Sequence, residues 1–144
     1  MYLDPNWRIL TIGDGDLSFS HAVFNHIQPA HLTASVYDPL TELSQKYGDD
    51  FYQQLIAQDC SVITQLDITQ PDSWPNDLGA HFDVVIFQFP LLPAFKSKAE
   101  FQASKGMDNN LLNRRLLRHF LINSVARLLD PRGEQLCFIT SKDV

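Results

Sequence analysis

The chain has little cysteine, no long apolar run and no excess of basic residues, and each shortage argues against a class of protein. Its two cysteines, Cys60 and Cys137, form no close pair and no Cys/His cluster, which indicates neither a disulfide framework nor a zinc site. The longest largely apolar runs, such as residues 82–87, are far below the roughly 20 residues of a membrane-spanning helix. No basic-then-apolar leader opens the chain. We therefore expect a cytoplasmic protein with unpaired thiols, no metal and no membrane partner.

Charge is unevenly distributed along the 144 residues, which fit one ordinary globular domain, residues 1–144. The whole chain has 11 basic and 17 acidic residues, a net charge of −6. Residues 94–127 hold 7 of the basic residues and 2 of the acidic ones, which leaves 4 basic and 15 acidic residues elsewhere. A basic segment on an acidic body can face phosphate. The alternative is a solvated helix face with a lysine-bearing loop.

Apolar periodicity alternates between strand and helix along the chain. We expect strands at residues 9–12, 32–37, 61–68, 82–89 and 134–140. A first helix is expected after the turn at residues 13–16, with Ser18 or Asp16 as its cap and an end at Pro29. Further helices are expected over residues 40–55, with a break at 48–50, and over 111–129. A lysine-bearing loop of about twenty residues precedes the last helix. This alternation predicts an α/β fold with an open, mostly parallel sheet covered by helices on both faces.

The turn after the first strand, Gly-Asp-Gly-Asp, has the residue types of a small-molecule site. In sheets of this kind the ligand lies outside the carboxyl ends of the strands. Gly13 and Gly15 allow a tight turn and a close approach of the ligand. Asp14 and Asp16 can accept hydrogen bonds from a cationic amino group. The two carboxylates, together with Ser18 at the third glycine position of a dinucleotide motif, argue against a bound pyrophosphate.

Two more carboxylates follow later strands. Asp38, at the end of the second strand, is placed to bind the two hydroxyls of a ribose, and Asp67, after the third, can accept from the amino group of adenine. A ligand with a cationic amino acid end, a ribose and an adenine is S-adenosylmethionine. The alternative is that the glycines only form a turn and that Asp38 and Asp67 cap the elements that follow.

The fourth strand ends in Gln88-Phe89-Pro90. This triplet resembles the Asn-Pro-Pro-aromatic corner with which methyltransferases hold a planar base near the methyl donor. The Gln88 carbonyl and the backbone can accept hydrogen bonds there, and Phe89 can stack on the ring. These three residues are the candidate catalytic set, and Gln88 also borders the expected cofactor site. The alternative is a buried strand end with Phe89 in the core.

Three segments together resemble the Rossmann-like domain of the uridine-N3 methyltransferases of eukaryotic large-subunit ribosomal RNA. They are residues 9–20, residues 82–90, and Asn113-Arg114 followed by Leu116, Leu117, Phe120, Ser124 and Gly133-Glu134. The resemblance spans nearly the whole chain in matching order. It implies a class I methyltransferase fold with strand order 3-2-1-4-5, S-adenosylmethionine as methyl donor, and RNA, specifically ribosomal RNA, as the partner.

The chain departs from this family at two positions and at its end. The family's fourth strand typically ends in Asn-Phe-Pro-His, whereas Gln88 and Leu91 stand here at the asparagine and histidine positions. The class I fold usually continues through another helix and an antiparallel strand pair, so the resemblance implies a C-terminally short domain without the final strand pair. We expect a partner chain or a second copy of this chain to cover the exposed edge of the last strand.

The function expected from this resemblance is methyl transfer to uridine N3, with Gln88, Phe89 and Pro90 orienting the acceptor base. The residues expected to contact RNA are Lys96, Lys98, Asn113, Arg114, Arg115 and Arg118. One alternative is a catalytically weakened module that binds S-adenosylmethionine or RNA. Another is a magnesium-dependent phosphatase, with Asp14 as nucleophile and Asp16 as general acid/base. A nicotinamide dehydrogenase is disfavoured because the third glycine is missing.

Overall fold

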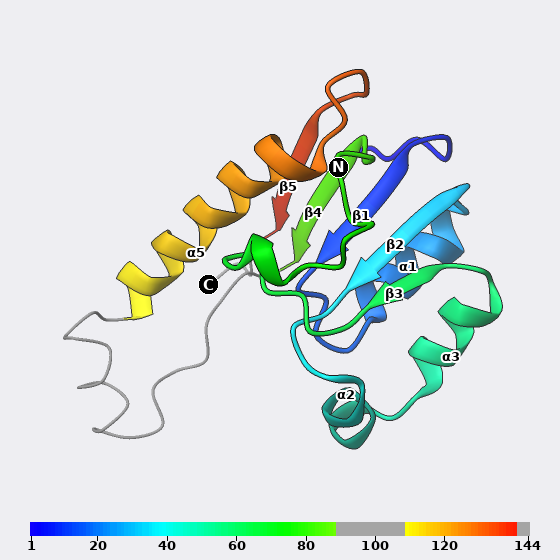
Figure 1. The fold of residues 1–144 in the computed structure, drawn as a ribbon. Helices are drawn as coiled ribbons and strands as arrows, with labels where there is room; N and C mark the ends of the chain where they lie inside the picture. The colour runs from blue at the N-terminus through cyan, green and yellow to red at the C-terminus, as the bar shows by residue number, and fades with distance from the viewer. Residues whose placement is uncertain (89–108, 141–144) are drawn as a thin grey trace, which may run out of the picture.

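The computed structural model describes residues 1–88 and 109–140 (Figure 1). Five strands form one sheet in the order β3-β2-β1-β4-β5, and every neighbouring pair is parallel. The strands are β1 (Arg8–Ile12), β2 (His31–Ser35), β3 (Ser61–Ile63), β4 (Val84–Gln88) and β5 (Leu136–Thr140). This sheet confirms the α/β class and the strand order 3-2-1-4-5.

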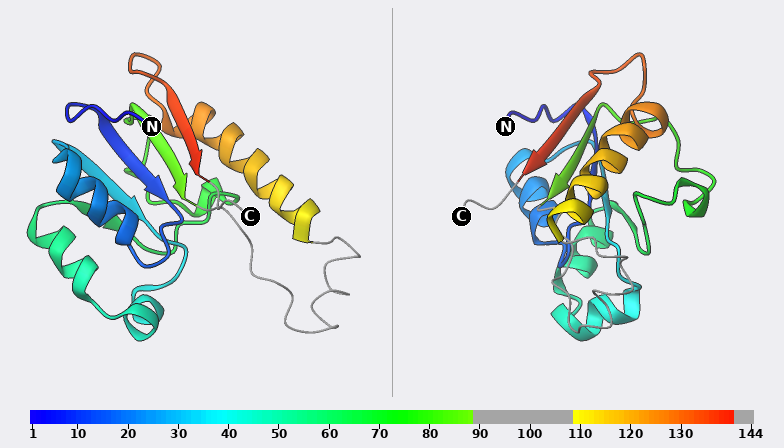
Figure 2. Two further views of the ribbon diagram at one scale, coloured as in Figure 1. Left: turned by 180° about the vertical axis from the view of Figure 1, so that it is seen from behind. Right: turned by 90° about the vertical axis from the view of Figure 1, so that its left-hand side faces the viewer.

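The helices lie on both faces of the sheet, and α1 and α5 lie on opposite sides of it (Figure 2). Four of them are α1 (Ser18–Ile27), α2 (Leu40–Tyr47), α3 (Asp50–Ala57) and α5 (Asn109–Asn123). A 3-10 turn, η1 (Pro71–Ser73), precedes β4, and a π-helical turn, η2 (Ser124–Leu128), continues α5. The break between α2 and α3 confirms the interruption predicted at residues 48–50. No helix in the described part of the chain is long and apolar enough to cross a membrane.

The two central strands, β1 and β4, are buried on both faces. Ile9 and Val84 pack with the helices of the α1 side, while Leu10 and Val85 pack with the α5 side, and all four are fully buried. Such alternation between two covered faces explains the nearly continuous apolar run of β4. Central burial of these strands leaves the polar residues that follow them at the carboxyl edge of the sheet.

The third strand is shorter than its predicted range of residues 61–68, because β3 ends at Ile63. The chain turns at Gln65, which has a φ of 58°, and the Leu66 N–H donates to the Val36 carbonyl at 3.0 Å. Leu66 and Ile68 then pack into the core on the α5 side. These two residues are therefore apolar because they pack in the core on the α5 side, and not because the strand continues. The other strand ends lie within two residues of the prediction over the described residues.

The last helix is also modified, because α5 gives way to a π-helical turn at Ser124. The Leu129 N–H donates to the Ser124 carbonyl five residues earlier, at 2.9 Å. This wider turn buries both Leu128 and Leu129, and Leu129 bridges to Phe82 beside the sheet. Leu129 has an extended backbone at the end of this turn, so the chain leaves the helix there. The helix predicted over residues 111–129 is confirmed to within two residues at each end, with a π-helical last turn that was not predicted.

At the amino edge of the sheet one carboxylate joins three strands. Asp83, just before β4, accepts from the backbone N–H and the side chain of Arg8 in β1, at 2.9 to 3.1 Å, and from the Glu134 N–H before β5 at 3.3 Å. Arg8 also pairs with Asp130 at 3.1 Å. The hydrogen bond from Arg8 lowers the pKa of Asp83. A Cβ at Gly133 would lie 2.2 Å from Asp83 Oδ1, so a glycine is required there.

Candidate ligand site at the carboxyl edge of the sheet

A cavity of about 350 Å³ lies at the carboxyl ends of β1 and β4. Its volume falls within the range of roughly 300–1,000 Å³ that is usual for small-molecule sites. It is lined by Gly13, Asp14, Gly15, Asp16, Ser18, Phe19, Tyr47 and Gln88. The structure thus brings together six of the residues predicted from the sequence to bind a cofactor. Of the predicted set, Asp38 and Asp67 lie outside this lining.

The two glycines of the turn have different roles. Gly13 has a φ of +70°, and a Cβ there would lie 2.7 Å from Cε1 of Phe87 in β4. Both the left-handed backbone and the close ring therefore require glycine at this position. Gly15 has no such conformation, and a Cβ there would meet only the Tyr47 hydroxyl, at 3.9 Å. Gly13 forms the turn, and Gly15 leaves room in the cavity.

Asp14 caps α1. Its side chain is buried, and its carboxylate accepts from the N–H of Ser20 at 2.7 Å and of Phe19 at 3.3 Å. Burial raises the pKa of the Asp14 carboxyl, and the hydrogen bonds from Ser20 and Phe19 oppose that rise. The residue at the helix boundary, Leu17, has a left-handed backbone and provides no side-chain cap. The cap predicted at Ser18 or Asp16 is therefore supplied mainly by Asp14, because the left-handed Leu17 turns the chain back over it.

Asp16 is the carboxylate of the turn that has an unoccupied oxygen. Its Oδ1 accepts from the Ser18 N–H at 3.0 Å, while Oδ2 has no partner among residues 1–88 and 109–140. The eight residues of the lining include two carboxylates and no basic side chain. Such a cavity attracts a cationic group and repels an anionic phosphate.

Gln88 ends β4 at the rim of the cavity and is held by the neighbouring strand. Thr140 is its register partner in β5, and the Thr140 hydroxyl donates to Gln88 Oε1 at 2.5 Å. The carbonyl that was expected to accept from a substrate is therefore already bonded within the protein. The other two candidate catalytic residues, Phe89 and Pro90, lie outside the described residues.

Asp38 and Asp67 both have partners within the protein. Asp38 forms an ion pair with Lys46 at 3.0 Å and thereby raises the pKa of that lysine. Asp67 Oδ1 accepts from the N–H and the hydroxyl of Thr69, at 2.9 and 2.6 Å. The Trp74 ring N–H donates to the Asp67 carbonyl at 2.7 Å. Asp67 thus forms a local turn, as the alternative interpretation of this residue expected, with Oδ2 unpartnered in the described part of the chain.

Two residues of the cavity were not predicted as site residues, Phe19 and Tyr47. Both fall on the apolar spacing of a helix, which gave no reason to place them in a ligand site. The exposed fraction of Tyr47, 52%, shows that this ring is not used in the core. The only signal available in the sequence was its position beside Gly48, where α2 ends.

The predicted RNA-contacting residues divide between the described helix α5 and the part outside the structure. Arg114, Arg115 and Arg118 are exposed on α5, and Asn113 is half-buried there. The amino end of α5 lies toward the carboxyl edge of the strands, on the face opposite α1 (Figures 1 and 2). Lys96 and Lys98 lie outside the described residues.

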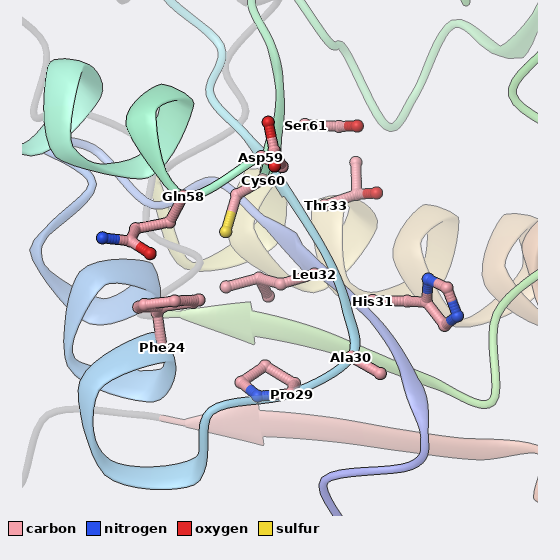
Figure 3. Close-up of a pocket in the computed structure, with 10 residues that line it drawn as sticks. All are labelled: Phe24, Pro29, Ala30, His31, Leu32, Thr33, Gln58, Asp59, Cys60 and Ser61. Atoms are coloured by element: carbon pink, nitrogen blue, oxygen red, sulfur yellow. The ribbon is translucent and has the colours of Figure 1, made fainter.

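Two other hollows lie away from this edge. One, of about 120 Å³, is at the amino ends of β2 and β3, where the thiol of Cys60 points toward Phe24 and Leu32 (Figure 3). Burial raises the pKa of this thiol. The other, of about 430 Å³, lies between η1 and Arg127. The described residues contain no group of three or more His, Cys, Asp or Glu residues that could hold a metal ion.

Comparisons with known proteins place the chain in a family. A search of curated proteins found no match. Among solved structures, the chain is similar to a protein from Thermoplasma acidophilum described as a candidate methyltransferase, with 20% identity and a TM-score of 0.41. That match covers 61% of this chain and 35% of the other. The family model "BMT5-like: rRNA (uridine-N3-)-methyltransferase BTM5-like" matches residues 10–144. The chain therefore belongs to the BMT5-like rRNA (uridine-N3-)-methyltransferase family.

Proposed function

We propose that this chain is a methyltransferase domain that uses S-adenosylmethionine to methylate N3 of uridine in ribosomal RNA. The observation that supports this best is the cavity at the carboxyl ends of β1 and β4, which has two carboxylates and no basic side chain. S-adenosylmethionine has a sulfonium and an ammonium group, so it suits this charge, whereas a dinucleotide pyrophosphate does not. Membership of the family supports the same reaction.

Three carboxylates suit three groups of the methyl donor: Asp16 in the cavity, and Asp38 and Asp67, which lie outside its lining. Asp16 Oδ2 is available for the ammonium group, and Gly15 leaves space beside it. Asp38 would take the ribose hydroxyls, because its ion pair with the half-exposed Lys46 is weak enough to exchange. Asp67 would accept from the adenine amino group through Oδ2. The bound donor supplies the methyl group, and these residues hold it in position.

On the acceptor side, Gln88 would orient the base, together with Phe89 and Pro90. In this in-line displacement the methyl carbon bonds to N3, S-adenosylhomocysteine leaves and the N3 proton passes to solvent, so the alignment of the acceptor nitrogen supplies much of the rate enhancement. The exposed arginines of α5, with Lys96 and Lys98, would bind the RNA phosphates. We place the base and the donor at the same edge of the sheet, where Gln88 and the Gly13–Asp16 turn share one cavity.

The phosphatase alternative is not favoured by the state of Asp14. A nucleophilic aspartate needs a carboxylate oxygen that reaches the phosphorus. Both oxygens of Asp14 instead accept from backbone N–H groups of α1 inside the protein. A binding module without turnover remains the second candidate, favoured by Gln88 and Leu91 at the family's asparagine and histidine positions.

Two measurements test the proposal in order. Isothermal titration with S-adenosylmethionine should give one bound molecule per chain, whereas titration with NAD should give no heat of binding. Transfer of labelled methyl to ribosomal RNA, followed by nucleoside analysis, should then yield 3-methyluridine. Absence of donor binding would refute the proposal. Binding without transfer would select the binding module.

A further inference from the structure

Gln88 and Thr140 end two neighbouring parallel strands, side by side and on the same face. They are register partners in the β4–β5 pair, so their side chains point to the same side of the sheet. Ile86 and Phe138, two residues earlier in each strand, both pack in the core on the α1 side. That is the side on which Gln88 lines the cavity, and both side chains are half-buried.

The hydrogen bond between them occupies the carbonyl of the Gln88 amide and leaves its NH₂ group available. A glutamine side chain has one carbonyl acceptor and two N–H donors. The Thr140 hydroxyl donates to Oε1, and no described residue accepts from Nε2. With its carbonyl held against β5, Gln88 offers the cavity hydrogen-bond donors and not an acceptor.

We propose that Thr140 is a positioning residue that sets Gln88 as a hydrogen-bond donor and thereby selects the class of acceptor base. This inference rests on the proposed methyltransferase function. The Gln88 N–H groups can donate to the carbonyl oxygens that flank the ring nitrogen in the imide of uracil. They disfavour an exocyclic amino group, as in cytosine or adenine, because two donors would then face each other. An asparagine or glutamine free to turn would not discriminate in this way.

The first test detects the hydrogen bond without any turnover. In the ¹⁵N-labelled chain, the Gln88 side-chain amide is assigned by its loss in Gln88→Glu. We expect Thr140→Val to shift this amide signal and increase its motion, because the valine keeps the shape and removes the hydroxyl. Thr140→Ser should leave the signal near its wild-type position. An amide signal unaffected by Thr140→Val would overturn the inference, whatever the transfer activity.

The second test measures base selection by methyl transfer to otherwise identical RNA oligonucleotides that contain uridine or cytidine. We expect Thr140→Val to lower kcat for the uridine RNA about tenfold, the effect of about one hydrogen bond, with KM for S-adenosylmethionine within about twofold. Thr140→Ser should rescue kcat. Gln88→Glu keeps an oxygen for Thr140 but replaces the donors by an acceptor, so it should lose transfer to uridine.

Each remaining outcome decides between the two proposals. Wild-type transfer to uridine by Gln88→Glu, or equal kcat for Thr140→Val and Thr140→Ser, would refute the selection by Thr140 while the methyltransferase function stands. A wild-type chain that shows the amide signature but transfers no methyl group would refute the proposed function, and the base selection with it. Denaturant unfolding of both Thr140 variants controls for a general loss of stability.

Discussion

At the residue scale, the first two residues of the Gly-Asp-Gly-Asp turn have structural roles that the last two do not share. Gly13 and Asp14 shape the turn, the first through its left-handed backbone and the second as the cap of α1. All four residues line the cavity, but Gly15 has no left-handed backbone, and Asp16 has one oxygen without a partner among the described residues. The same substitution should therefore lower stability at one position of the turn and leave it nearly unchanged two residues later.

The glycines provide the first prediction. Gly13→Ala should lower the free energy of unfolding by about 2 kcal/mol or more, since the left-handed backbone costs an alanine about 1–2 kcal/mol and its Cβ meets the Phe87 ring. Gly15→Ala, the matched control, should stay within about 0.5 kcal/mol of wild type. Urea unfolding of both variants checks this. Equal stability of the two would contradict the assignment of the turn to Gly13.

The aspartates provide the second prediction. Asp14→Ala should cost about 1–2 kcal/mol of stability, because α1 loses its cap. Asp16→Ala should cost less, yet weaken S-adenosylmethionine binding about tenfold, since it removes the carboxylate proposed for the ammonium group. Urea unfolding and isothermal titration measure the two effects. Unchanged affinity for S-adenosylmethionine in Asp16→Ala would show that another group binds the ammonium.

At the element scale, the two edges of the sheet are built for different tasks. The amino edge is closed by the Arg8–Asp83–Asp130 cluster, which ties β1, β4 and the turn before β5 together. The carboxyl edge holds the cavity and the Gln88–Thr140 pair. Substitutions in the amino-edge cluster should therefore change stability without touching the cavity.

The amino edge provides a pH prediction. The folded-state pKa of Asp83 is lowered, so its stabilisation is complete above its unfolded pKa of about 3.9 and is lost as pH falls through the folded value. Asp83→Asn should cost about 1–3 kcal/mol at pH 7, and the gap to wild type should narrow below about pH 4. Urea unfolding across this range checks it. A gap that stays constant to pH 2 would refute the role of the charge.

Wild type and Asp83→Asn must be compared, because Asp14 changes the pH dependence of stability in the opposite direction. Its folded-state pKa is raised, so its protonation favours the folded state as pH falls. The pH dependence of wild type alone therefore combines two opposing terms. The difference between wild type and Asp83→Asn isolates the contribution of Asp83.

At the scale of the whole molecule, charge is separated between the cavity and α5. The charged side chains that line the cavity are both carboxylates, whereas α5 has exposed arginines on the opposite face of the sheet. The amino end of α5 lies toward the same edge of the sheet as the cavity (Figure 1). The proposed cationic methyl donor and the proposed RNA substrate would thus approach regions of opposite charge. The expected partner that covers the edge of β5 stays a prediction, which light scattering can test.

This separation gives a prediction about salt dependence. Arg114→Glu with Arg118→Glu should weaken RNA binding about tenfold at physiological salt and reduce its dependence on salt, because fewer phosphates are neutralised. Affinity for S-adenosylmethionine should not change. Arg132→Glu, in the exposed turn at the amino edge, reverses one charge and is the matched control for Arg114→Glu alone. Equal losses from the control would show that only net charge matters.

Much of the fold could be predicted because its signals are local. The run that became β4 and the glycine turn after β1 depend on neighbouring residues, and both lie where they were expected. The third strand was predicted too long, because Leu66 and Ile68 are apolar for a second core that only the folded chain creates. The π-helical turn at Ser124 was not predicted, because the hydrogen bond from the Leu129 N–H to the Ser124 carbonyl that defines it leaves no mark in the apolar spacing.

The sequence by itself determined the α/β alternation, the turn at the carboxyl edge and the acidic character of the site, since these follow from periodicity and residue type. Only the tertiary structure decided which carboxylate is free and which end of the Gln88 amide is occupied. Asp14 is used by the helix that folds back over it, and Gln88 Oε1 by Thr140, 52 residues away. Hydrogen-bond partners so distant in sequence are set by strand register, which no local pattern contains.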